Sequence, residues 1–198
     1  IISSLIEHKA VVDPCQALEQ KGYEITFLDV DEHGRIDLKQ LESAIREDTI
    51  LVSLMAGNNE IGTLNQLIEI GQITRDRGVL FHSDATQGVG KIPIDVERMN
   101  IDLLSMTAHK IYGPKGIGAL YVRRKKPRVR ISPIMFGGGH ERGFRSGTLN
   151  VPGIVGFGKA IELAIEEMSS EAERQIGLRQ HFYKRMTDAL DYVFLNGH

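Results

Sequence analysis

Short apolar runs alternate along the chain with longer stretches in which apolar residues recur at helical spacing. The apolar runs, each of which predicts a strand, cover residues 1–4, 23–28, 49–55, 79–82, 101–106 and 118–123. Helical spacing predicts helices over residues 9–21, 37–46 and 66–77, with a single helical turn at 95–99. An alternation of strands and helices is typical of βαβ units. We therefore predict an α/β fold with a mostly parallel sheet flanked by helices.

From residue 151 onward only helical periodicity remains, and it continues to about residue 193. A long helical segment of this kind often links a sheet domain to a second, smaller domain. We predict that residues 1–160 form most of a large domain. Residues 161–198 then hold linking helices and the start of a small α/β domain. The chain opens without an initiator methionine and stops at His198, so we interpret it as the middle of a longer protein.

Composition restricts the classes of protein to which the chain can belong. Its 198 residues are 41% hydrophobic and 25% charged, which is ordinary for a soluble globular protein. A formal net charge of −2 argues against general nucleic-acid binding, which needs an excess of cations. A single cysteine, Cys15, excludes a disulfide framework and favours a reducing compartment, so we expect the cytoplasm, or the mitochondrial matrix in a eukaryote. No apolar stretch approaches the length of a membrane span.

Residues 123–130 contain six basic residues in eight positions. A run of this kind can indicate a surface that binds nucleic acid. No aromatic residues are interleaved with the cations, and the chain as a whole is not basic. We interpret the run as a solvated hairpin or as a contact with an acidic partner protein.

Polar residues follow three of the predicted strands. Asn58 and Asn59 follow the third strand, Asp84 follows the fourth, and Lys110 follows the fifth. In an open α/β sheet the carboxyl ends of the strands form one edge, where ligands bind. We therefore expect these side chains to share one crevice. Taken singly, each has a simpler interpretation: a turn for the asparagines, a helix cap or loop acid for Asp84, and a solvated loop lysine for Lys110.

A lysine and a carboxylate at one site suit pyridoxal phosphate (PLP), because its aldehyde forms a Schiff base with lysine and its ring nitrogen pairs with an acid. Thr107 and His109 offer further hydrogen-bond donors next to Lys110. The glycine-rich segments 113–118 and 137–148 could bring backbone amides close to an anion, although the second could also be a connector. We predict no metal site.

Five segments of the chain together resemble the cysteine desulfurases of the NifS/IscS-like branch of the class V aminotransferases, which have the PLP-dependent fold type I. The segments, which occur in the order typical of that family and extend across essentially the whole chain, are Glu7–Val11, Asn58–Gly62, Ser83–Gln87, Ala108–Gly116 and Arg142–Thr148.

The resemblance implies catalytic roles for particular residues. Lys110 would form the Schiff base with PLP, and Asp84 would pair with the pyridine nitrogen. His8 would stack on the face of the ring, although a lone histidine after a strand is more often a surface or capping residue. His109 would contact the cofactor from its phosphate side and could also move a proton.

The remaining implied roles concern binding of the cofactor and assembly of the protein. Asn59 and Gln87 would hydrogen-bond the phenolic oxygen of PLP, although Gln87 could also simply belong to its turn. Thr107 would hold the cofactor from the phosphate side. Thr148 would reach the phosphate bound to a neighbouring subunit, so the resemblance implies a homodimer.

The reaction that the resemblance implies is conversion of L-cysteine to L-alanine, with sulfur passed as a persulfide to an iron–sulfur scaffold or another acceptor protein. The nucleophilic cysteine, the arginine that binds the substrate carboxylate and a phosphate-binding loop are expected outside residues 1–198. Cys15 lies on a predicted early helix and is not expected to be the nucleophile. The alternatives are another class V enzyme, such as a selenocysteine lyase or an aminotransferase, and a catalytically silent dimerising fragment.

Overall fold

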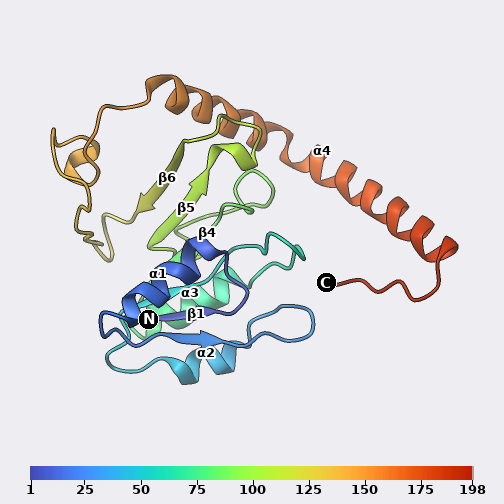
Figure 1. The fold of residues 1–198 in the computed structure, drawn as a ribbon, viewed down its shortest axis with the longest axis horizontal. Coiled ribbons are helices and arrows are strands. Elements are labelled where there is room, and N and C mark those ends of the chain that lie inside the picture. Colours follow the sequence, from blue (N-terminus) through green and yellow to red (C-terminus); the bar gives the residue numbers. More distant parts are fainter. Residues whose placement is uncertain (198) are drawn as a thin grey trace.

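A computed structural model describes residues 1–197 and shows one six-stranded sheet with the order β2-β1-β3-β4-β5-β6 (Figure 1). The first five strands pair in parallel, and β6 is antiparallel to β5. The predicted α/β fold with a mostly parallel sheet is confirmed. The strands are β1 (Ile2–Ser4), β2 (Thr26–Leu28), β3 (Leu51–Ser53), β4 (Leu80–Asp84), β5 (Leu103–Thr107) and β6 (Gly118–Val122).

The helices match the predicted ranges to within a few residues at each end. They are α1 (Lys9–Glu19), α2 (Leu38–Ala44), α3 (Leu67–Asp76) and α4 (Val151–Ala189), with 3₁₀ turns η1 (Ala108–Lys110) and η2 (Glu141–Gly143). Asp37 caps α2, because its Oδ1 accepts a hydrogen bond from Lys39 N at 2.8 Å. The turn predicted at 95–99 is a single hydrogen-bonded turn, closed by Met99 N and Asp95 O at 2.9 Å.

The central strands are buried on both faces, as their near-continuous apolar sequences predict. Val52 and Phe81 are fully buried neighbours in register across β3 and β4. Backbone pairing continues beyond β3, since Leu54 N donates to His82 O at 3.1 Å and Ala56 N donates to Asp84 O at 2.9 Å. These bonds extend the pairing of β3 and β4 to the carboxyl edge of the sheet, where the polar residues that follow the strands begin.

Helix α4 is continuous from residue 151 to residue 189, whereas the sequence suggested two helical segments. Its first turns pack on η1 through Phe157 and Ala108, and its later turns extend away from the sheet (Figure 1). The predicted division between residues 160 and 161 lies inside this helix, so it remains a prediction. Although α4 has 39 residues, no helix within residues 1–197 is both long and apolar enough to cross a membrane.

A buried cluster of charges fixes the start of β5. Asp102 is 1% exposed; its Oδ1 pairs with Arg75 at 2.9 Å and with Arg123 at 3.1 Å, and its Oδ2 accepts from Phe81 N at 3.0 Å. Arg123 is also buried and donates to the carbonyl oxygens of Val96 and Ile101. Both oxygens of Asp102 and all three guanidinium nitrogens of Arg123 therefore have a partner, as a buried ion pair requires.

We expect Asp102→Ala to lower the free energy of unfolding by about 3–5 kcal/mol, because it leaves the Arg123 guanidinium buried without its carboxylate. Urea denaturation measures this change. The matched control is Glu97→Ala, which removes the exposed partner of the same arginine and should cost less than about 1 kcal/mol. If the two variants lost equal free energy of unfolding, the buried Asp102–Arg123 pair would not be the main stabilising contact of this cluster.

Candidate active site

A cavity of about 310 Å³ lies at the carboxyl edge of four adjacent strands, β1, β3, β4 and β5. The chain passes from β1 to β2 on one side and then to β3 on the other, so the cavity lies where the winding of the sheet reverses. Ligands of open α/β sheets bind at such a point, and the volume suits a small cofactor. The lining residues are His8, Ala10, Met55, Gly57, Asn59, Asp84, Thr86, Gln87, Thr107, His109 and Lys110.

Seven of the eight residues singled out from the sequence line this one cavity, and the exception is Thr148. Thr148 is exposed on the loop that precedes α4. Its expected ligand is bound to a second subunit, so the role of Thr148 remains a prediction.

Asp84 ends β4 and is the buried acid of the cavity, with 9% of its surface exposed. Its Oδ1 accepts a hydrogen bond from Thr86 N at 2.9 Å, so it does stabilise the turn that follows the strand. No group within residues 1–197 hydrogen-bonds its Oδ2. The Oδ2 atom is not fully buried, so a ligand in the cavity can reach it, and a protonated ring nitrogen would be a suitable partner.

Lys110 ends the 3₁₀ turn η1 and is exposed at the cavity. A neighbouring lysine that sequence analysis did not single out, Lys91, donates to Gln87 Oε1 at 2.7 Å. Burial, together with the charge of Lys110, lowers the pKa of Lys91. Since its oxygen is engaged by Lys91, Gln87 presents its amide N–H groups as the free donors, which is the polarity that a phenolate oxygen requires.

Thr107 and His109 form a pair on the β5 side of the cavity. The Thr107 hydroxyl lies 3.3 Å from Ile117 O and 2.9 Å from His109 Nδ1. With its proton on Nδ1, His109 donates to Thr107 Oγ1 and has a free proton acceptor at Nε2; with its proton on Nε2, it accepts from the hydroxyl.

His8 lines the cavity and also caps α1. Its Nδ1 accepts from Ala10 N at 3.1 Å, so in this arrangement the ring N–H is at Nε2. The capping interpretation and the predicted ring-stacking role are compatible, because the cap uses one ring nitrogen and leaves the ring face open to the cavity.

Two residues that sequence analysis left without a role, Glu7 and Asn58, organise this edge of the sheet. Glu7 is buried, and its Oε1 accepts from Met55 N at 2.7 Å and from the Ser4 hydroxyl at 3.3 Å. Asn58 Nδ2 donates to Ile6 O at 2.9 Å. Both bonds join the turn after β1 to the segment after β3. The signal for Glu7 was an acidic residue in the short segment between a buried strand and a helix.

The pKa of Glu7 is raised to about 7, mainly by burial and to a smaller extent by the charge of Asp84, while the hydrogen bonds from Met55 N and Ser4 lower it. Between pH 4.5 and pH 7 the folded protein therefore binds more protons than the unfolded chain, and its stability falls as the pH rises.

We expect Glu7→Gln to remove this dependence. The free energy of unfolding of the variant, minus that of the wild type, should grow by about 3 kcal/mol from about pH 4.5 to about pH 8, measured by urea denaturation. A constant difference across that range would show that Glu7 has an ordinary pKa in the folded protein.

The other segments noted in the sequence lie outside the cavity. Arg123 is buried in the Asp102 cluster, whereas the remaining five cations of 123–130 are exposed and form no ion pair with another residue of 1–197. The glycine-rich loop 137–148 closes on itself, since Ser146 Oγ donates to Gly137 O at 2.8 Å. Cys15 is buried in α1, and burial raises the pKa of its thiol.

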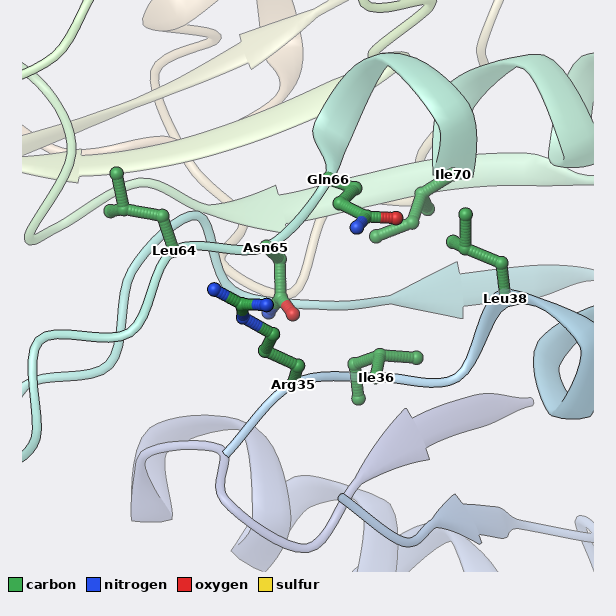
Figure 2. Close-up of a pocket in the computed structure, with 7 residues that line it drawn as sticks. All are labelled: Arg35, Ile36, Leu38, Leu64, Asn65, Gln66 and Ile70. Atoms are coloured by element: carbon green, nitrogen blue, oxygen red, sulfur yellow. The ribbon is translucent and has the colours of Figure 1, made fainter. Parts of the chain in front are cut away.

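A second cavity of about 200 Å³ lies between the start of α2 and the start of α3 (Figure 2). Arg35, Asn65 and Gln66 are its polar residues, and Ile36, Leu38, Leu64 and Ile70 complete its lining. It contains none of the residues singled out for chemistry, so the first cavity is the candidate active site.

Comparison with known proteins agrees with this choice. The family model of the class V aminotransferases matches residues 1–197. The chain belongs to the class V aminotransferase family. Membership in this family implies PLP as cofactor, and the cavity fits it, because a carboxylate oxygen of Asp84 without a hydrogen-bond partner within residues 1–197, amide donors from Gln87 and the amine of Lys110 line one space.

Individual members of the class V aminotransferase family are closely similar to this chain. It is 60% identical to the cysteine desulfurase IscS of Anaeromyxobacter sp. (strain Fw109-5) and 57% identical to that of Escherichia coli, in each case over the whole chain and 48% of the relative. A solved NifS-like protein superimposes with a TM-score of 0.88 at 44% identity, covering 92% of this chain and 50% of that protein. The chain thus spans about half the length of these relatives.

Proposed function

We propose that this protein is a PLP-dependent cysteine desulfurase that converts L-cysteine to L-alanine. The observation that carries the proposal is the single cavity in which the ends of β4 and β5 bring Asp84 and Lys110 together, in a chain 57–60% identical to cysteine desulfurases. A solved structure named SspA in complex with cysteine, 46% identical with a TM-score of 0.78, supports cysteine as the substrate.

PLP, when bound, supplies an electron sink that stabilises negative charge on the substrate carbon next to the amino group. Asp84 Oδ2 would keep the ring nitrogen protonated, which maintains that sink. Lys110 Nζ would hold PLP through its aldehyde, and as an amine it could take or return a proton at the substrate. Gln87 and Asn59 would hold the phenolic oxygen.

The histidines and Thr107 complete the arrangement. His8 would cover one face of the ring and exclude water from it. With its proton on Nδ1, directed to Thr107, His109 could take or return a proton at Nε2. We assign the nucleophilic cysteine, the carboxylate-binding arginine and the sulfur acceptor to no residue of 1–198.

We further propose a homodimer in which Thr148 contacts the cofactor phosphate of the partner subunit. Large apolar side chains close to the Thr148 loop support an interface there, since Ile134 is 91% exposed and Phe136 is 84% exposed. Sedimentation of the purified protein tests the dimer. Sulfur transfer to an iron–sulfur scaffold, in the cytoplasm, follows from the same proposal.

The test of the proposed function is chemical labelling of the purified chain. With added PLP we expect a visible absorption band, and after borohydride reduction a single labelled peptide that contains Lys110. The control is Lys115→Ala, which removes an exposed lysine outside the cavity and should leave the label unchanged. Labels scattered over surface lysines would contradict the proposal. Release of alanine from L-cysteine by the full-length protein then distinguishes a desulfurase from another class V enzyme or a silent fragment.

A further inference from the structure

The turn after β1 carries His8 into the cavity, and three bonds hold this turn to the rest of the sheet. Leu5 N donates to Leu28 O at 3.2 Å, which joins the turn to β2. Asn58 Nδ2 donates to Ile6 O at 2.9 Å, and Glu7 Oε1 accepts from Met55 N at 2.7 Å. The bond to Glu7 is the shortest of the three, and Glu7 directly precedes His8 in the chain.

The carboxyl group of Glu7 has an unusual environment for an ionised side chain. Its Oε2 is inaccessible to solvent and has no hydrogen-bond partner within residues 1–197. No arginine, lysine or histidine forms an ion pair with it in that part of the chain. The titratable groups that face it are Asp84 from β4 and Cys15 from α1. An anion there would be desolvated, unpaired on one oxygen and close to a second carboxylate, each of which is costly.

A neutral carboxylic acid avoids these costs and keeps the bond to the Met55 amide, because Oε1 remains an acceptor when Oε2 carries the proton. It also removes the repulsion with Asp84, which lines the cavity. We propose that Glu7 is a positioning residue that acts as a neutral acid: it fixes the His8 turn to the end of β3 and so places His8 over the cofactor. This inference rests on the proposed function, since it takes PLP as the ligand of the cavity.

A double-mutant cycle tests whether Glu7 acts through His8. Glu7→Leu removes the acceptor, and Glu7→Gln reproduces the shape and hydrogen bonding of the protonated acid. Absorbance titration measures the PLP affinity of each purified variant. Each Glu7 variant is measured both with His8 present and in the His8→Ala background. We expect Glu7→Leu to weaken PLP binding about tenfold when His8 is present and less than twofold when it is absent. Glu7→Gln should bind within twofold of the wild type.

Labelling of the wild type distinguishes failure of the proposed function from failure of the positioning role of Glu7. If the wild type forms no adduct at Lys110, the proposed function fails first. If it does, equal weakening by Glu7→Leu in both backgrounds, or no weakening, overturns the positioning role. Loss of affinity in Glu7→Gln as large as in Glu7→Leu overturns the neutral acid. Glu19→Gln, an exposed acid at the end of α1, is the matched control, and thermal melting shows that each variant is folded.

Discussion

Replacement of Lys110 by alanine should abolish borohydride labelling of the cavity and reduce alanine formation by the full-length protein by at least about 10³-fold. The reason is that Lys110 is the one lysine among the residues that line the cavity, so no other amine there can hold the aldehyde. Peptide mapping after reduction and an assay of released alanine measure the two effects.

Stability separates this chemical role from a structural one. The Lys110 side chain is exposed and its removal uncovers little apolar surface, so the free energy of unfolding of the apoprotein should change by no more than about 0.5 kcal/mol. Lys91→Met provides a comparison, because it removes a neighbouring ammonium group that contacts Gln87 without touching the aldehyde. Activity that survives Lys110→Ala, or labelling transferred to Lys91, would show that the attachment site has been assigned to the wrong lysine.

Asp84→Asn should lower activity by about 10²–10³-fold, because the amide cannot hold the ring nitrogen in its protonated form. PLP should also dissociate more readily, since one charge-assisted hydrogen bond is lost. Absorbance titration measures the affinity, and the alanine assay measures the rate.

The same substitution should leave the apoprotein no less stable than the wild type. The amide oxygen of the new side chain would still accept from Thr86 N, and the exchange removes a buried negative charge that lies close to Glu7. A lower melting temperature for the apoprotein, with little change in PLP affinity, would instead indicate that Asp84 only stabilises its turn.

The sequence allowed the main features of the site to be predicted because one geometric rule links them. Asn59, Asp84 and Lys110 each follow an apolar strand, and the carboxyl ends of parallel strands form one edge. The sheet order places β3, β4 and β5 side by side, so the residues that follow these strands do line one cavity. The role of each residue toward the cofactor remains a proposal, because no finding here tests it.

Other features could not be predicted because they depend on contacts between distant segments. Glu7 lies 48 residues from the Met55 amide that it accepts from, and nothing in the local pattern links them. Asp102 lies within an apolar run that predicts a strand, and its partners Arg75 and Arg123 come from α3 and from the residue after β6. The role proposed for Thr148 involves a second subunit, so the contacts within one chain do not test it.

The reversal of winding between β1 and β3 has a consequence for how the protein fluctuates. Residues that line the cavity range from His8 to Lys110 and come from four strands that are separate in the chain. Opening of any one of these strands, including the β5–β6 hairpin that carries Thr107, removes part of the lining. Occupancy therefore protects the central sheet as one cooperative unit, and the slowest amide hydrogens of β1, β3, β4 and β5 should exchange together, at a rate set by the ligand concentration.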